Sequence, residues 1–365
     1  MNYNGIRKIK REVRIGNLTM GSTFPVVIQS MTNTDTEDVA ATLSQVKALE
    51  AAGCELVRLT VPNQNAAKTA YALKEAGVQI PLVADIHFDY KIALAAAEAG
   101  FDKIRINPGN IGDDEHVKEV CRACKKRGIP IRIGVNSGSL EKSILAKHGA
   151  PTAEALVESA LYHVSLLEKF DFTDIVVSIK SSDVSNMIAA NRLLSESSPY
   201  PIHLGVTESG GGNRGLIKSS VGIGSLLCDG IGDTIRVSLT DSPVEEIHAA
   251  KAILQAIGME GKCGLNIVSC PTCGRTKIDL ISLTKEFERR VEAEGLSEIP
   301  VKVALMGCAV NGPGEAREAD FGFAGGVGEA LFFRHGQVVE KIPEEHVIER
   351  LIEELCRYRN SLKHS

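Results

Sequence analysis

The chain of 365 residues contains no tryptophan, and aromatic residues make up only 4% of it. It has no apolar run near the ~20 residues that a transmembrane helix requires. Basic residues are not in excess either, since 41 Lys and Arg stand against 46 Asp and Glu, a net charge of −5. This balance argues against a nucleic-acid-binding surface. The segment from Met1 to Arg14 is basic but lacks the apolar core of a signal peptide, so we expect a cytoplasmic protein.

Cysteines are also sparse, and their number, nine, is odd. A disulfide framework is therefore not expected, and the cysteines are either metal ligands or buried thiols. Cys121 and Cys124 form a Cys-x-x-Cys pair, but they fall inside a predicted helix without a glycine turn, which favours core or surface thiols. The length suffices for two domains, or for one large and one small domain.

Eight short apolar runs, each followed by a helical pattern, repeat between residues 24 and 240. This alternation predicts a closed parallel (β/α)8 barrel. The predicted strands are Phe24–Met31, Leu56–Pro62, Ile80–Phe88, Lys103–Pro108, Pro130–Asn136, Asp174–Lys180, Pro201–Glu208 and Thr234–Thr240. An open doubly wound sheet is the alternative, but it would show a Gly-x-Gly-x-x-Gly turn after its first strand, and the chain has none.

Turns and breaks that contain glycine divide the chain further. Residues Glu12–Met20 alternate around Gly16-Asn17 and predict a hairpin that closes the barrel floor. The glycine-rich break Gly258–Gly264 predicts a boundary between a substrate-binding barrel, residues 1–258, and a small α+β domain, residues 259–365. Helices are predicted at Glu37–Ala52, Thr152–Phe170, Ser242–Ile257, Asp279–Glu294 and Glu344–Tyr358, and a strand at Val301–Leu305, with Thr152 and Ser242 as N-caps.

Polar and basic residues gather at the ends of the predicted barrel strands, where the active site of this fold lies. Four arginines and a lysine among them predict an anion site, because the arginine fork matches phosphate oxygens. The candidate binding residues are Arg58, Asp85, His87, Arg105, Asn107, Arg132, Asn136, Lys180, Arg236 and Ser238. The loop Gly210–Asn213 is a further candidate for phosphate binding. The alternative for any one cation is a structural ion pair, for example with Asp85.

Two cysteine motifs predict a metal centre in the second domain. Cys270-Pro-Thr-Cys273 is answered downstream by Cys308 in Met-Gly-Cys-Ala-Val-Asn-Gly-Pro-Gly-Glu, which ends at Glu315. Thiolates are soft ligands that select zinc or an iron–sulfur cluster. Three thiolates and one weaker carboxylate ligand would leave a replaceable position, which favours catalysis over a structural role. Cys263 is an alternative fourth ligand.

These motifs, together with Gln-Ser-Met-Thr, Val-Ala-Asp-Ile-His-Phe, Arg-Ile-Asn-Pro-Gly-Asn and Arg-Ile-Gly-Val-Asn-Ser-Gly-Ser, resemble 4-hydroxy-3-methylbut-2-enyl diphosphate synthases in their bacterial two-domain form. That family consists of iron–sulfur enzymes of the methylerythritol phosphate route to isoprenoids. The resemblance implies a [4Fe–4S] cluster on Cys270, Cys273, Cys308 and Glu315. It also implies reductive ring opening of 2-C-methyl-D-erythritol 2,4-cyclodiphosphate to 4-hydroxy-3-methylbut-2-enyl diphosphate, with loss of water.

The resemblance further implies an oxidoreductase supplied with electrons by reduced flavodoxin or ferredoxin. It implies a head-to-tail homodimer in which the cluster domain of one subunit caps the barrel of the other. In that setting Glu208, expected to be buried in the anion site, is the candidate proton donor to the oxygen that departs as water. Asn311 is a candidate hydrogen-bond donor to the substrate oxygen bound at the cluster. Two alternatives remain at this point: a zinc-bearing barrel transferase, and a non-catalytic iron–sulfur sensor, which would not need five cations at a barrel mouth.

Overall fold

A computed structural model describes residues 7–21, 23–259, 264–309 and 317–362 of the chain. The chain divides into two compact units, Met1–Met259 and Glu260–Ser365. Among the described residues, no helix has both the length and the apolar character needed to cross a membrane.

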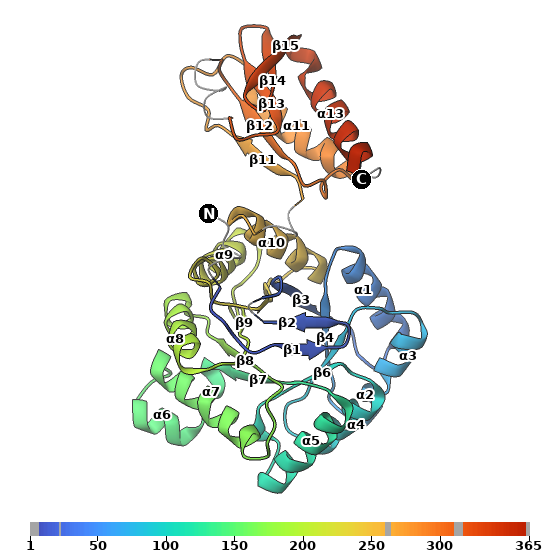
Figure 1. The fold of residues 1–365 in the computed structure, drawn as a ribbon, viewed down its shortest axis with the longest axis vertical. Coiled ribbons are helices and arrows are strands. Elements are labelled where there is room, and N and C mark those ends of the chain that lie inside the picture. Colours follow the sequence, from blue (N-terminus) through green and yellow to red (C-terminus); the bar gives the residue numbers. More distant parts are fainter. Residues whose placement is uncertain (1–6, 22, 260–263, 310–316, 363–365) are drawn as a thin grey trace. The chain divides into compact units, whose positions relative to one another are not determined.

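The first unit is a (β/α)8 barrel, as the sequence predicts (Figure 1). Its strands are β3 (Val27–Met31), β4 (Leu56–Thr60), β5 (Leu82–Asp85), β6 (Lys103–Ile106), β7 (Ile131–Asn136), β8 (Ile175–Lys180), β9 (His203–Leu204) and β10 (Thr234–Ile235). They pair in parallel in the order β8-β7-β6-β5-β4-β3-β10-β9. A parallel bridge between Val177 and Ile202 joins β8 to β9, which closes the ring.

Helices follow the strands and surround the ring (Figure 1). They are α1 (Val39–Ala51), α2 (Gln64–Ala67), α3 (Thr69–Glu75), α4 (Tyr90–Ala99), α5 (Asp114–Arg127), α6 (Lys142–His148), α7 (Ala153–Glu168), α8 (Val184–Ser197), α9 (Gly212–Cys228) and α10 (Pro243–Ala256). The two predicted N-caps are confirmed, because Thr152 accepts a hydrogen bond from the amide of Ala155 and Ser242 one from Val244. The apolar faces of the barrel helices pack on the strands and form the main core.

The predicted hairpin is present as β1 (Val13–Ile15) and β2 (Leu18–Met20), paired antiparallel. Its buried Val13, Ile15 and Met20 pack against inward-facing residues at the N-terminal ends of the barrel strands, including Val27 and Leu56. Apolar side chains of the hairpin and of the first strand residues therefore close this end of the barrel.

The second unit is a five-stranded sheet with helices on one face. Its strands are β11 (Asn266–Ser269), β12 (Lys302–Met306), β13 (Phe321–Gly325), β14 (Glu329–Arg334) and β15 (Gln337–Pro343), and its helices are α11 (Leu280–Ala293) and α13 (Val347–Leu362). Strands β11, β12 and β13 are parallel, whereas β13, β14 and β15 form an antiparallel meander. Phe287 of α11 and Leu351 of α13 pack with Phe323 of the sheet in one core.

Only β12 of this unit was predicted, as Val301–Leu305, whereas β11, β13, β14 and β15 were not. The glycine-rich segment Gly322–Gly328 conceals β13, yet Gly322 is required there because an added Cβ would stand 2.1 Å from the carbonyl oxygen of Ala304 on β12. The terminal helix α13 also begins and ends later than expected, at Val347 and Leu362, after a 3-10 turn at Glu344–His346.

Candidate active site

A cavity of about 130 Å³ opens among the C-terminal ends of the barrel strands. Its lining residues are Arg58, Asp85, His87, Arg105, Arg132, Gly134, Asn136, Ser178, Lys180, Thr207, Arg236 and Ser238. We call this set the barrel pocket, and it contains every predicted strand-end binding residue except Asn107. The loop Gly210–Asn213, the further candidate for phosphate binding, contributes no residue to it. Gly134, Ser178 and Thr207 were not selected from the sequence, although the two-residue period of a strand places Gly134 on the face of Arg132 and Ser178 on that of Lys180.

Strand register brings the charged side chains together. Asp85 on β5 pairs with Arg105 on β6, and Arg105 with Arg132 on β7. Four residues further along β7, nearer the mouth, Asn136 pairs with Lys180 on β8. Because neighbouring parallel strands present paired residues to the same face, these side chains line one continuous wall of the barrel pocket.

Asp85 is the anionic centre of this wall. Its carboxylate lies 3.0 Å from Arg105 and 3.7 Å from Arg58, and the guanidinium of Arg105 also lies 3.4 Å from Nε2 of His87. Burial alone would raise the pKa of Asp85, but Arg58, Arg105 and Arg132 together lower it to about 2. Asp85 therefore stays ionised and orients two arginines, so the structural ion pair considered for it exists within the anion site.

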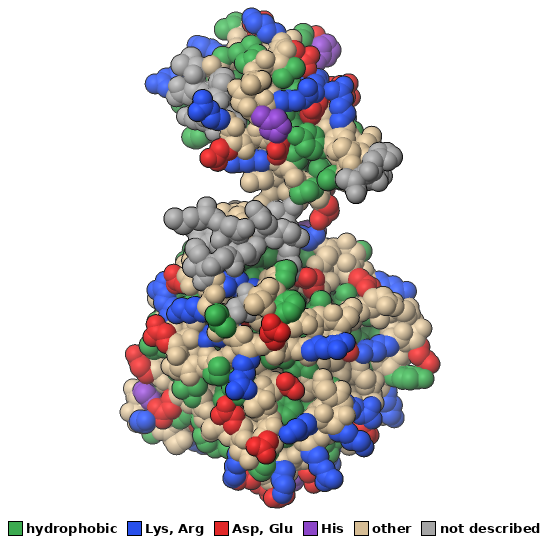
Figure 2. Space-filling model, in the orientation of Figure 1, with side chains coloured by type: hydrophobic (Ala, Val, Ile, Leu, Met, Phe, Trp, Pro, Cys, Tyr) green, Lys and Arg blue, Asp and Glu red, His purple; other side chains and the backbone are tan. Residues whose placement is uncertain are grey.

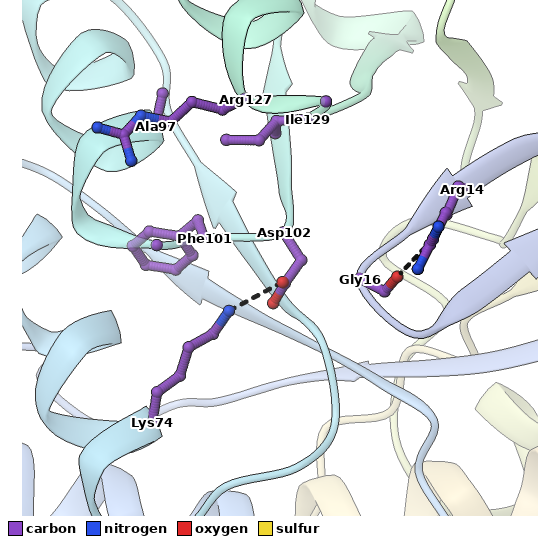
Figure 3. Close-up of a pocket in the computed structure, with 10 residues that line it drawn as sticks. Arg14, Gly16, Lys74, Ala97, Phe101, Asp102, Arg127 and Ile129 are labelled. Carbon is purple, nitrogen blue, oxygen red and sulfur yellow. Dashed lines mark hydrogen bonds and ion pairs between the residues drawn. The ribbon is translucent and has the colours of Figure 1, made fainter.

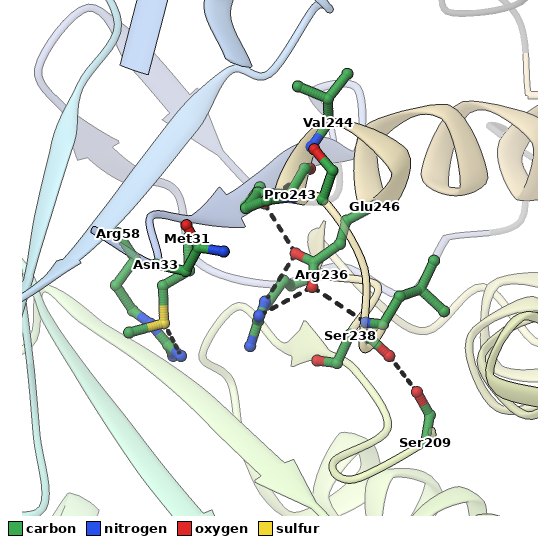
Figure 4. Close-up of polar contacts among 12 residues, drawn as sticks. Met31, Asn33, Arg58, Ser209, Arg236, Ser238, Pro243, Val244 and Glu246 are labelled. Atoms are coloured by element: carbon green, nitrogen blue, oxygen red, sulfur yellow. Dashed lines mark hydrogen bonds and ion pairs between the residues drawn. The ribbon is translucent and has the colours of Figure 1, made fainter. Parts of the chain in front are cut away.

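A second carboxylate, Glu246 of α10, was missed by the sequence prediction. It is buried and lies 3.0 Å from Arg236, and it also accepts hydrogen bonds from Ser30 and from the amide of Leu239. Figure 4 shows the guanidinium of Arg236 turned toward Glu246, while that of Arg58 points to the sulfur of Met31. Glu246 differs from the other acidic residues of α10 only in that it is buried on an otherwise apolar face of the helix. The sequence alone does not show this burial.

Two cations of the barrel pocket have few or no anionic contacts. Arg132 is 1% exposed, and its Nε and Nη1 atoms have no hydrogen-bond acceptor among the described residues. Burial lowers the pKa of Lys180 well below its ordinary value, and the nearby Arg236 and Arg58 lower it further. Glycines allow this crowding, because a Cβ at Gly134 would stand 2.6 Å from Nε of Arg105 and one at Gly205 2.8 Å from Nζ of Lys180.

The barrel pocket thus holds five basic side chains, from Arg58, Arg105, Arg132, Lys180 and Arg236, against the two carboxylates of Asp85 and Glu246. Acidic and basic side chains are interspersed over the face of the barrel helices shown in Figure 2. The barrel pocket itself carries an excess of positive charge in a low-dielectric setting, where it attracts an anion strongly. Arginine forks at this density suit a ligand with several phosphate oxygens.

Two predicted residues differ from expectation. The side chain of Glu208 is exposed and does not line the barrel pocket, so the expectation that it is buried in the anion site is wrong. Its φ of 51° shows that the loop after β9 turns there through the left-handed region, which directs the side chain away from the strand path. Asn107 is buried beyond the end of β6, and its Oδ1 has no hydrogen-bond donor among the described residues.

The loops after β6 and β7 are joined by an imidazole that the sequence did not single out. His163 of α7 is fully buried; its Nδ1 accepts a hydrogen bond of 3.2 Å from the amide of Gly109, and its Nε2 lies 2.5 Å from Glu141. Burial lowers the pKa of His163, so the ring is neutral and its Nε2–H donates to the carboxylate. Gly109 follows Asn107 by two residues, which ties this contact to the rim of the barrel pocket.

A larger cavity, of about 570 Å³, lies at the N-terminal ends of the strands, between the β1–β2 hairpin and the segments before β6 and β7 (Figure 3). Lys74 pairs there with Asp102, and Arg14 donates to the carbonyl of Gly16. Residues at this end of a (β/α)8 barrel serve stability rather than catalysis, so we do not assign the activity to it.

In the second unit, the cysteine motifs meet at one edge of the sheet. Cys270 follows β11 and Cys308 follows β12, and these strands are parallel neighbours whose C-terminal ends coincide. The amide of Gly307 donates a 3.2 Å hydrogen bond to the sulfur of Cys270. The amide of Cys273 donates to the hydroxyl of Thr276, which fixes the turn that follows the second cysteine of the motif. Backbone donors aimed at a thiolate are the environment that cysteine-bound metal clusters use.

Three predicted residues, Asn311, Glu315 and Cys263, lie outside the described residues. Within the described ranges, no three Cys, His, Asp or Glu side chains are arranged closely enough to hold a metal ion. The other Cys-x-x-Cys pair is different, because both thiols are buried on α5 and desolvation raises the pKa of Cys121 to about 12 and that of Cys124 further. These two side chains are packing thiols, as the sequence indicated.

A closed barrel with a strongly cationic pocket, followed by a unit with cysteines at its sheet edge, is typical of a barrel enzyme that acts on an anionic substrate. Family models match both parts: the GcpE TIM-barrel domain matches residues 10–251, and the GcpE protein C-terminal domain matches residues 266–357. The chain belongs to the GcpE family.

Relatives over nearly the whole length agree. The chain is 57% identical over 348 residues to a protein of Clostridium perfringens (strain 13 / Type A), covering 95% of this chain and 98% of the relative. It is 55% identical over 341 residues to one of Fusobacterium nucleatum subsp. nucleatum, covering 93% and 95%. Both relatives are named 4-hydroxy-3-methylbut-2-en-1-yl diphosphate synthase (flavodoxin).

A solved structure supports the barrel fold alone. The type I 3-dehydroquinate dehydratase of Clostridium difficile superposes with a TM-score of 0.51 at 14% identity, covering 68% of this chain and 98% of that one. At this identity the likeness carries no information on substrate or chemistry.

Proposed function

We infer that the chain catalyses the reaction for which its relatives are named. It is an oxidoreductase that converts 2-C-methyl-D-erythritol 2,4-cyclodiphosphate to 4-hydroxy-3-methylbut-2-enyl diphosphate in isoprenoid precursor biosynthesis. The substrate takes up two electrons and two protons, a ring C–O bond breaks, and one oxygen leaves as water. The diphosphate stays attached to the product throughout.

The observation that carries this function is the barrel pocket, with five basic side chains against two carboxylates. We propose that Arg58, Arg105, Arg132, Lys180 and Arg236 hold the cyclic diphosphate. Asp85 positions two of the arginines, while His87, Asn136 and Ser238 contact the remaining substrate oxygens. Asn107 supports the rim from the loop after β6. Holding both phosphates at fixed points leaves the carbon ring oriented for a single outcome.

Proteins of this family use a [4Fe–4S] cluster, which supplies the two electrons when it is bound. The donor set fits such a group, because Cys270 and Cys308 end adjacent parallel strands and Gly307 already donates to the Cys270 sulfur. We propose Cys270, Cys273, Cys308 and Glu315 as its ligands and residues 259–365 as the cluster domain. A zinc-bearing transferase has no comparable support from the relatives.

The proton donor remains a proposal of its own. We propose that Glu208 delivers a proton to the departing oxygen and that Asn311 donates a hydrogen bond near Glu315. Glu208 lies on the loop between β9 and α9 and directly follows Thr207, which lines the barrel pocket. Its exposure keeps it accessible to solvent protons between turnovers.

The proposed function also includes an electron donor and an oligomeric state. The relatives are named for flavodoxin, and we propose a flavodoxin as the electron donor of this chain, with ferredoxin as the alternative carrier. We also propose a cytoplasmic homodimer, with residues 1–258 as the substrate-binding domain. A dimer would allow the cluster domain of either subunit to serve a barrel.

Anaerobic turnover tests the function directly. Protein reconstituted with iron and sulfide and supplied with reduced flavodoxin should release 4-hydroxy-3-methylbut-2-enyl diphosphate from the cyclodiphosphate. Glu208→Gln should retain substrate affinity and the cluster absorbance but lose turnover. Retained turnover in Glu208→Gln would remove the acid role, whereas no product from wild-type protein would remove the reaction.

A further inference from the structure

The barrel interior beneath the barrel pocket contains polar side chains where this fold usually has branched apolar ones. Inward-facing residues of a (β/α)8 barrel lie in layers of four, each contributed by alternate strands. The pairing register places one such layer at Gln29, Val83, Arg132 and His203, on β3, β5, β7 and β9. The next layer toward the hairpin consists of Leu56, Lys103, Val176 and Thr234.

Four side chains of these two layers are buried without hydrogen-bond partners among the described residues. Gln29 is 1% exposed, and neither its Oε1 nor its Nε2 has a partner. The same holds for Nζ of the fully buried Lys103, for Nε2 of the fully buried His203, and for Nε and Nη1 of Arg132. Because buried polar groups in native proteins are almost always hydrogen-bonded, this cluster requires a further partner.

Strand order places these atoms around one centre. Strands β3 and β7 lie opposite each other in the ring, so Gln29 and Arg132 face each other across the barrel axis, yet no hydrogen bond joins them. Burial lowers the pKa of His203, and the charges of Arg132 and Lys103 lower it further, so its ring is neutral. Gln29 therefore contributes the only unpartnered oxygen of the cluster, and nitrogen atoms make up the rest.

Carboxylates of the described barrel do not balance this charge. Asp85, two layers closer to the mouth, is already engaged, with Oδ1 3.0 Å from Arg105 and Oδ2 3.7 Å from Arg58. Asp233 lies just before the inward-facing Thr234, but it pairs with Arg7 and accepts a hydrogen bond from the amide of Ile202. The cations Lys103 and Arg132 thus lie in neighbouring layers without a facing acid.

We propose that the barrel interior binds one small monovalent inorganic anion, such as chloride, beneath the barrel pocket. Its ligands are the unpartnered nitrogen atoms of Gln29, Lys103, Arg132 and His203. A halide accepts hydrogen bonds from several donors at once and also offsets their charge, whereas a water molecule offers two acceptor positions and no charge. This site does not depend on the proposed function, because it involves neither the cyclodiphosphate nor the cluster ligands.

An uncharged Lys103 is the competing explanation. Burial, together with the cations Arg132 and Arg58, lowers the pKa of Lys103 well below its ordinary value. A neutral amine would relieve the repulsion, but it would leave the same nitrogen atoms without acceptors. A bound anion removes both costs, and only the anion makes stability depend on chloride.

Urea unfolding of the intact chain, followed by circular dichroism, tests this dependence. Sodium chloride replaces sodium gluconate at constant ionic strength, because gluconate is too large for a closed layer of side chains. A ligand of the folded state alone raises the folded-to-unfolded ratio about tenfold for each tenfold rise above its dissociation constant. We expect this response from the wild type and none from Lys103→Met, which should be the more stable protein in gluconate.

Lys10→Met is the matched control. Lys10 is also buried, but its Nζ donates to the carbonyl oxygens of Ser195 and Ser198, at the C-terminal end of α8 outside the barrel interior. This variant should keep the full chloride response of the wild type. Anomalous diffraction from wild-type crystals grown in bromide locates the ion independently of any variant, and we expect a peak between Lys103 and Arg132.

Three results would overturn the inference. A wild type that does not respond to chloride would show that the interior holds a neutral lysine or water. Equal responses in the wild type, Lys10→Met and Lys103→Met would show that chloride acts elsewhere. Bromide peaks confined to the barrel pocket would assign the anion to the substrate site.

Discussion

Arg132→Met is expected to stabilise the unliganded protein and to abolish tight substrate binding. Arg132 is 1% exposed, and two of its nitrogen atoms lack acceptors among the described residues. Burial and the neighbouring Arg58 and Arg105 lower its pKa, against the attraction of Asp85. The unliganded barrel therefore carries a buried cation that only a bound anion satisfies fully.

The two effects have opposite signs and estimable sizes. Replacing a poorly compensated buried ion with an apolar side chain of similar volume is neutral or stabilising by about 1–4 kcal/mol. A hydrogen bond to a charged group is worth about 1.5–3 kcal/mol. Loss of a bidentate contact between Arg132 and a phosphate therefore weakens substrate binding by about 3–6 kcal/mol, or roughly 10²–10⁴-fold.

Lys103→Met is the matched control. Lys103 begins β6, is fully buried with no acceptor for its Nζ among the described residues, and does not line the barrel pocket. The same change there should also raise stability, yet it removes no phosphate contact and should leave most of the substrate affinity. The contrast separates the general effect of removing a buried cation from the specific loss of a ligand contact.

Urea unfolding followed by circular dichroism, which suits a chain without tryptophan, measures the stability of all three proteins. Calorimetry with the cyclodiphosphate measures affinity. A lower free energy of unfolding for Arg132→Met together with unchanged affinity would refute the reasoning, because it would make Arg132 a structural residue rather than part of an anion site.

Three further predictions concern other parts of the site. The pKa of Lys180 is lowered in the unliganded pocket, and a bound diphosphate raises it, so substrate binding is coupled to the uptake of a proton. Substrate affinity measured by calorimetry should therefore fall as the pH rises above the lowered pKa. Lys180→Arg should flatten this pH dependence, because arginine stays protonated. Glu246→Gln removes the charge opposite Arg236 and should lower the free energy of unfolding by roughly 1–3 kcal/mol in the same urea assay, with an unchanged midpoint contradicting the pairing. His163→Phe should raise KM for the cyclodiphosphate more than it lowers kcat, with partial rescue by His163→Asn, whose oxygen can accept from Gly109; equal kinetics in both variants would make the histidine a mere core residue.

The barrel and most of its pocket were predictable because both follow from periodic rules. Eight apolar strand runs alternate with helical patterns along the chain. Within each strand, side chains alternate between the two faces, and this alternation places Arg105 and Arg132 inside the barrel. Parallel strands end at one edge, so residues far apart in sequence, such as Arg58 and Arg236, converge without any local signal being needed.

The parts that escaped prediction depend on tertiary contacts. Glu246 reaches the pocket from a helix, and its role exists only because α10 packs beside β3 and places the carboxylate under Arg236. Glu208 was expected inside the anion site, but a left-handed turn at that residue exposes it. Strand β13 was hidden by glycines whose reason is the close approach of β12.

The measurement that tests the account most directly is electron paramagnetic resonance of anaerobically purified, reduced protein, with and without the cyclodiphosphate. We expect an iron–sulfur signal that changes when substrate is added to the wild type and stays unchanged when the same concentration is added to Arg132→Met. A colourless protein that contains zinc and gives no cluster signal would contradict it.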